Sequence, residues 1–153
     1  MAAQYLGSLP NSLAGTWRIT RVLPTTNSTC WSPQDAQPLL GSTLTYRRDM
    51  LRWHGGQIAV TDVSLRNLTD KEFRQENSGA ESPADFAQLD IHAGRVTEVD
   101  LQHEDADVLP ASTAVPGDSV LLAGSNRIIV SACGIYFEAT RAASTSTNKS
   151  YGR

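Results

Sequence analysis

The sequence predicts an all-β fold: an antiparallel up-and-down barrel of roughly eight strands, with two or three short helices in its loops. Short runs of alternating polar and apolar residues recur along the 153-residue chain, and this is the period of a strand with one buried face. Most of the runs are joined by short turn sequences, and no helical pattern is long enough to cover a parallel sheet. A closed barrel is the simplest arrangement that leaves no strand edge exposed.

The first expected strand, 15–23, sets the inward face of the barrel. Trp17 and Ile19 alternate there with Arg18 and Thr20, so the face that carries the large apolar side chains should point inward. The turn sequence Gly124-Ser125-Asn126 predicts a tight hairpin near the end of the chain. The other expected strands are 42–47 continuing through 50–53, then 57–65, 95–102, 119–123, 127–132 and 134–141.

Short helices are expected between the strands. Residues 32–33 form a helix start, with Ser as the cap and Pro at the first helical position, and Gly41 is the stop. The polar stretch 66–94 holds two more small capped turns, at 69–73 and 82–86. The apolar residues expected to hold this excursion against the barrel are Phe73, Phe86 and Leu89.

Length and composition indicate one folded domain. Hydrophobic residues make up 40% of the chain and charged residues 19%, which is ordinary for a globular protein. We expect an N-terminal extension over 1–14, a barrel domain over 15–141 and a disordered C-terminal tail over 142–153. The abundance of Ser and Thr and the rarity of Lys favour a periplasmic or extracellular location, although the chain starts without a signal-peptide pattern.

Charge and hydropathy exclude two classes of partner. The net charge is −3, and no basic cluster is longer than Arg47-Arg48, so nucleic acid is not an expected partner. No apolar run reaches the roughly 18–20 residues of a membrane-spanning helix. The two cysteines, Cys30 and Cys133, form a disulfide if the protein is exported, or else remain two buried thiols.

Residues at both ends of the predicted barrel carry a resemblance. Gly15-Thr16-Trp17 opens the first strand and Arg141 closes the last one, and this arrangement resembles the lipocalin and wider calycin families, including exported bacterial lipocalin-like proteins. The resemblance implies that Trp17 and Arg141 pack together where the barrel closes. A guanidinium lying flat on an indole gains about 0.5–2 kcal/mol of cation–π energy.

The resemblance and the strand periodicity together predict an internal binding site. Arg21 shares the expected inward face of the first strand, where a guanidinium needs either a carboxylate such as Asp62, Glu98 or Glu138, or an anionic ligand group. Aromatic and apolar side chains from other strands are expected to form the walls. The predicted ligand-binding residues are Ile19, Arg21, Tyr46, Trp53, Val130 and Phe137.

These residues indicate a binding protein for a small apolar or amphipathic molecule inside the barrel. No catalytic, phosphate-binding or dinucleotide motif is present, no metal site is predicted around His92 or His103, and no cofactor is expected. An enzyme remains an alternative, namely a cyclase or isomerase that works by positioning its substrate. A second alternative is a protein-binding inhibitor or immunity protein whose barrel is filled and whose loops contact the partner.

Overall fold

The computed structural model describes residues 4–6, 9–23, 33–53, 56–76, 85–103, 115–132 and 135–142. Cys30 and Cys133 lie outside these residues. Its strands are β1 (Gln4–Leu6), β2 (Gly15–Val22), β3 (Thr43–Arg47), β4 (Met50–Trp53), β5 (Gly56–Thr69), β6 (Arg95–His103), β7 (Ser119–Gly124), β8 (Arg127–Ala132) and β9 (Ile135–Arg141). Helix α1 (Pro33–Ala36) continues into the 3-10 turn η1 (Gln37–Leu39), and helix α2 (Asp70–Glu76) follows β5.

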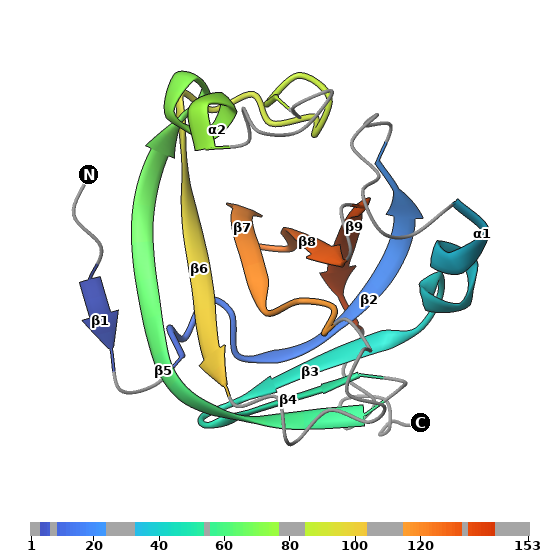
Figure 1. Ribbon diagram of the computed structural model, residues 1–153. Coiled ribbons are helices and arrows are strands. Elements are labelled where there is room, and N and C mark those ends of the chain that lie inside the picture. Colours follow the sequence, from blue (N-terminus) through green and yellow to red (C-terminus); the bar gives the residue numbers. More distant parts are fainter. Residues whose placement is uncertain are drawn as a thin grey trace, which may run out of the picture.

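Strands β2 to β9 form a closed antiparallel barrel of eight strands (Figure 1). Each strand pairs with the next one along the chain, and β2 pairs with β9 to close the ring. This confirms the predicted fold class and the strand order. The short strand β1, which falls in the segment expected as an N-terminal extension, adds to the outer edge of β5.

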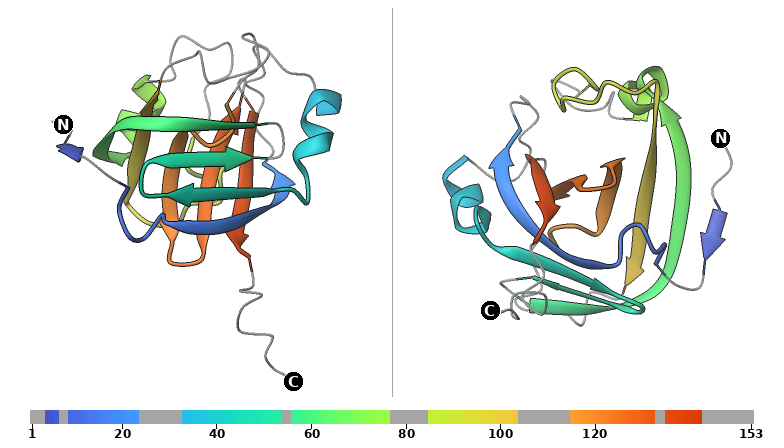
Figure 2. Two further views of the ribbon diagram at one scale, coloured as in Figure 1. Left: turned by 90° about the horizontal axis from the view of Figure 1, so that it is seen from below. Right: turned by 180° about the vertical axis from the view of Figure 1, so that it is seen from behind.

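The barrel is flattened into two layers whose strands cross. Figure 2 shows β3, β4 and the start of β5 running across β7, β8 and β9. Strand β5 belongs to both layers because it is 14 residues long and pairs first with β4 over 56–59 and then with β6 over 60–69. The register shifts between Val60 and Asp62, and such a bulge bends a strand and increases its twist.

The barrel interior is a single apolar core. Alternate residues of β2, β3, β4 and β9 are buried, as the period of two requires. Trp17, Tyr46 and Phe137 are the largest side chains that are almost completely enclosed in this interior core. The core also receives Leu9 and Leu13 from the segment before β2, and Ala36 and Leu39 from α1 and η1.

The expected contact between Trp17 and Arg141 is present where β2 meets β9. The guanidinium carbon of Arg141 lies 4.3 Å from the centroid of the Trp17 ring, and Trp17 Nε1 donates a hydrogen bond of 2.8 Å to the carbonyl oxygen of Leu13. Gly15 has a φ of +122°, and a Cβ there would lie 2.9 Å from Arg141 Nη1. A glycine is therefore required two residues before the indole.

Arg141 also holds the turn that precedes β2. Its Nη1 donates to the carbonyl oxygen of Ala14 at 2.9 Å and its Nη2 to that of Ser12 at 2.8 Å. The turn places Leu13 in the core with no exposed surface. One side chain from the last strand thus binds the indole and two backbone carbonyls from the start of the barrel.

A second apolar core lies on the outside of the barrel. Figure 1 shows α2 and the segment 85–94 beyond β7, β8 and β9, away from β3 and β4. The ring centroids of Phe73 and Phe86 are 5.8 Å apart, and those of Phe73 and Tyr136 are 6.2 Å apart. The buried residues of this outer core are Leu23, Leu68, Phe73, Phe86, Leu89, Ile91, Val96, Leu121 and Ile129. Phe73, Phe86 and Leu89 therefore hold the excursion against the barrel, as predicted.

Reciprocal hydrogen bonds start α2 and a turn that begins at Asp85, whereas residues 82–84 of the second predicted turn lie outside the described residues. The amide of Thr69 donates to Glu72 Oε1 at 2.8 Å, and the amide of Glu72 donates to Thr69 Oγ1 at 3.2 Å, which is the capping box expected before α2. Asp85 and Gln88 exchange the equivalent pair at 3.1 and 2.8 Å. Each short turn therefore satisfies its own first amides before it packs on the sheet.

Glu138 anchors the excursion electrostatically. It accepts hydrogen bonds from Arg21 and Arg127, and Arg127 also donates to the carbonyl oxygens of Leu89 and Asp90 at 2.7 and 3.1 Å. Burial would raise the pKa of Glu138, but the hydrogen bonds and charges of the two arginines lower it to about 2. Glu138 therefore stays ionised at neutral pH and holds both guanidinium groups on the outer surface.

Replacing Arg141 with Ala is expected to lower the free energy of unfolding by about 1–3 kcal/mol, because two backbone carbonyls lose their donor and the indole loses its cation. Arg141→Lys keeps the charge without the planar fork and should recover only part of the loss. Urea unfolding followed by Trp fluorescence measures both. The control is Arg48→Ala in an exposed turn, which should change stability by less than about 0.5 kcal/mol. An Arg141→Ala variant as stable as this control would contradict the role of the contact.

Glu138→Gln is expected to destabilise the protein at pH 7 by about 1–3 kcal/mol, because two guanidinium groups lose a charged acceptor. The folded-state pKa of about 2 lies below the usual 4.5, so the carboxylate stabilises the fold above pH 4.5, and this stabilisation is lost as the pH falls towards 2. Urea unfolding from pH 7 to pH 2 should show the difference between wild type and variant shrinking over that window. A difference that stays constant with pH would refute the assignment.

Candidate functional site

Five of the six predicted ligand-binding residues lie together in the interior core. Ile19, Tyr46, Val130 and Phe137 come from β2, β3, β8 and β9 and are almost completely buried. Trp53 joins them from β4 with 6% of its surface exposed. The alternation of each strand turns these side chains inward, and closure of the barrel packs them into one apolar core.

The prediction that Arg21 points into the barrel is wrong. The register between β2 and β9 shifts between Ile19 and Arg21, and this bulge turns Arg21 outward, where 47% of its side chain is exposed. Its Nε lies 3.0 Å from Glu138 Oε1. The carboxylate partner that the guanidinium required is therefore Glu138, one of the three considered, and it lies on the outer surface.

Two polar pairs lie at one end of the apolar interior. The hydroxyl of Tyr46 donates to the carbonyl oxygen of Gly117 at 2.7 Å, and His103 Nε2 lies 3.1 Å from Asp118 Oδ2. His103 is the last residue of β6 and shares the inward face with Val99 and Leu101. Gly117 and Asp118 directly precede β7, so the polar end is built from β3, β6 and the segment before β7.

Burial and neighbouring groups shift the pKa of two side chains at this end, Tyr46 and Asp118. Burial raises the pKa of Tyr46 well above its usual value, and the nearby Asp118 carboxylate raises it further, so the phenol keeps its proton and donates it to Gly117. Burial also raises the pKa of Asp118, while the hydrogen bond and charge of His103 lower it. Because a carboxylate only accepts, Nε2 of His103 carries the proton that faces Asp118, and in the tautomer with only this proton Nδ1 keeps a free lone pair.

His103 Nδ1 is a buried polar atom with an unused hydrogen-bonding site. Only 11% of the side chain is exposed, and within the described ranges Nδ1 has no hydrogen-bond partner. Burying such an atom without a partner costs about 1–3 kcal/mol, so the site favours a ligand or water that donates a hydrogen bond to it. The pair therefore presents an oriented polar atom without a partner at the border of the apolar core.

Sequence reasoning missed the role of His103. The sequence analysis considered this residue as a metal ligand. Its spacing of two and four residues from Leu101 and Val99 places it on the same, inward face of the strand. Asp118 is contributed by a segment 15 residues later, and nothing local in the sequence joins the two. His92 lies elsewhere, on the exposed surface beside Asp90 at 2.8 Å.

Two further observations concern only the described part of the chain. It contains no group of three or more His, Cys, Asp or Glu side chains placed to hold a metal ion. None of the helices in these ranges has the length and apolar character needed to cross a membrane.

Gly117→Ala is expected to destabilise the protein by about 2 kcal/mol or more. The φ of Gly117 is +90°, and a Cβ there would lie 2.3 Å from the Tyr46 hydroxyl, so the change strains the backbone and displaces the phenol. Urea unfolding measures the loss. In the matched control, Gly94→Ala, no atom lies within 4 Å of the added Cβ and stability should barely change. Equal stability of the two variants would show that position 117 accommodates a side chain beside Tyr46, contrary to this prediction.

In comparisons with family models, with curated proteins and with solved structures, nothing significantly similar to the chain was found. The closed antiparallel barrel is consistent with a lipocalin-like fold, and its apolar interior with one polar end is compatible with ligand binding.

Proposed function

We propose that this protein is a lipocalin-like binding protein that holds a small, partly apolar molecule inside its barrel. The observation that carries the proposal is the unpaired Nδ1 of His103 at the polar end of an apolar interior. Binding sites for small molecules combine apolar walls with a few oriented polar groups in this way. An eight-stranded barrel is also wide enough for either side chains or one small ligand.

The polar end determines which ligand group it accepts. Asp118 places a negative charge beside His103, and the lone pair of Nδ1 accepts a hydrogen bond, so the site favours a neutral donor such as an alcohol or a phenol. A carboxylate would meet like charge there and lose the hydrogen bond. This replaces the acidic ligand group expected beside Arg21, since that guanidinium is on the outer surface.

Two features support placing the protein among the lipocalin-like barrels. The strands follow the up-and-down order with β2 beside β9, and the Gly15-Thr16-Trp17 sequence meets Arg141 at that closure. A periplasmic or extracellular location belongs to the same proposal and is supported by the composition of the chain alone.

One observation favours a second candidate function. An imidazole oriented by a carboxylate has the arrangement of a general base, and His103 with Asp118 meets that description. A cyclase or isomerase that folds its substrate inside the barrel would use Nδ1 to remove a proton. Conversion of an added ligand, followed by mass spectrometry, separates this enzyme from a binding protein.

The test of the binding proposal uses the intrinsic fluorescence of Trp17 and Trp53, which both lie in the interior core. Titration with a medium-chain fatty alcohol, the matching fatty acid and the matching alkane should change the emission most strongly with the alcohol. Native mass spectrometry of the purified protein provides a second readout for a co-purified molecule. If no probe changes the emission and no bound molecule is found, the proposal fails.

Matched variants of His103 locate the ligand group. Gln places its amide near the position of Nε2 and Asn places it near that of Nδ1, so His103→Gln should weaken binding of the alcohol by about tenfold while His103→Asn retains more of it. A tenfold loss corresponds to about 1.4 kcal/mol, the value of one hydrogen bond. Equal affinity in wild type and both variants would show that the alcohol does not contact His103.

A further inference from the structure

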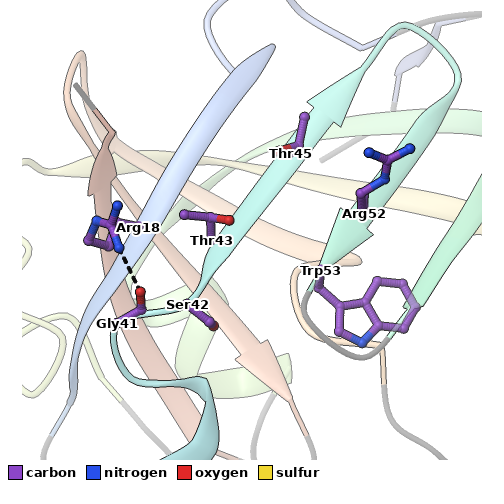
Figure 3. A pocket seen from close by; sticks show the side chains of 7 residues that line it. All are labelled: Arg18, Gly41, Ser42, Thr43, Thr45, Arg52 and Trp53. Atoms are coloured by element: carbon purple, nitrogen blue, oxygen red, sulfur yellow. Dashed lines mark hydrogen bonds between the residues drawn. The ribbon is translucent and has the colours of Figure 1, made fainter. Parts of the chain in front are cut away.

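The outer face of the sheet carries a groove, and the interior residue Trp53 lies at its edge. It measures about 300 Å³, and Figure 3 shows its two threonines lying between two arginines, with the indole of Trp53 at one side. The lining residues are Arg18, Gly41, Ser42, Thr43, Thr45, Arg52 and Trp53.

Strand register brings the polar side chains of the groove to one face. Arg18 of β2 lies opposite Thr43 of β3, and Thr45 of β3 lies opposite Arg52 of β4. Their neighbours along the strands are buried in the interior, so these four side chains point outward together. The two guanidinium groups therefore flank a pair of hydroxyl groups on adjacent strands.

The arginines of the groove lack carboxylate partners. Arg18 donates to the carbonyl oxygen of Gly41 at 2.7 Å, and Arg52 donates to the amide oxygen of Gln57 at 3.3 Å. Within the ranges that the structure describes, neither forms an ion pair, whereas Arg21, Arg66, Arg74 and Arg127 all do. Two uncompensated cations at one groove are notable in a chain whose net charge is −3.

The hydroxyl groups leave hydrogen-bonding capacity as well. Ser42 donates to the carbonyl oxygen of Leu39 at 2.6 Å, so its oxygen still accepts. Thr45 shares a hydrogen bond of 3.1 Å with Thr16, and Thr43 has no hydrogen-bond partner among the described residues. The groove thus combines cationic donors, hydroxyl groups and the edge of an indole.

We propose that this groove binds a sugar carrying an acidic group: a carboxylate, a phosphate ester or a sulfate ester. A planar guanidinium recognises all three anions through paired hydrogen bonds. The threonine and serine hydroxyls suit the hydroxyl groups of the ring, and the volume fits about one monosaccharide. An inorganic anion would use only the guanidinium groups, and a neutral sugar would use only the hydroxyl groups of the groove.

Isothermal titration calorimetry at low salt tests the site with four probes: glucuronate, glucose 6-phosphate, glucose and inorganic phosphate. Both acidic sugars should bind at least about tenfold more tightly than glucose and than inorganic phosphate. A preference between glucuronate and glucose 6-phosphate identifies the acidic group. Inorganic phosphate binding as tightly as glucose 6-phosphate would overturn the sugar assignment, and the absence of heat with every probe would overturn the site.

Arg18→Gln, Arg52→Gln and Thr43→Val should each reduce affinity for the preferred acidic sugar by about tenfold. Arg48→Gln is the matched control, because Arg48 is exposed in the turn between β3 and β4 and does not line the groove. Thermal unfolding of each variant checks that the fold is retained. Equal losses in Arg48→Gln and in the groove variants would overturn the site and indicate only a nonspecific effect of charge.

Discussion

The closure between β2 and β9 is the constraint on which the rest of the molecule depends. Without it, the eight strands form an open sheet with two exposed edges, and the interior side chains of β2 and β9 lose the neighbours that bury them. The closure consists of backbone pairing reinforced by one side chain. Arg141 covers the indole of Trp17 and donates to two carbonyls of the preceding turn, so the first and last strands are fixed in register as well as in order.

Closure also determines where chemistry is possible. It encloses an apolar core in which an unpaired polar atom is costly, which is why His103 Nδ1 stands out there and would not on the surface. Outside, the same sheet faces water, and uncompensated cations such as Arg18 and Arg52 are stable without partners. The interior and the outer groove therefore differ in chemistry, although Trp53 borders both: the first is apolar with one polar end, and the second carries two arginines without carboxylate partners among the described residues.

The strands were predictable because they depend on local alternation. The closing contact was predictable because Gly15-Thr16-Trp17 and Arg141 carry a resemblance to families in which these residues pack together. The bulge in β2 was not predictable from the sequence, because it depends on the pairing of β2 with β9. This bulge turns the side chain of Arg21 outward instead of inward. The outer core was partly predictable: the continuous apolar run Ile128-Ile129-Val130 indicates burial on both faces of β8. The pairing of His103 with Asp118 needed the three-dimensional structure, because two segments meet there that share no local pattern.

The pairing of β2 with β9 has a consequence for biosynthesis. During translation, the hairpins from β3 to β8 can assemble from neighbouring segments, but the free edge of β2 waits for residues synthesised more than a hundred positions later. Contacts of such long sequence separation form late and slowly. Until then the nascent chain presents an open edge and an uncovered indole, so the ribosome-bound intermediate is the species most in need of a chaperone.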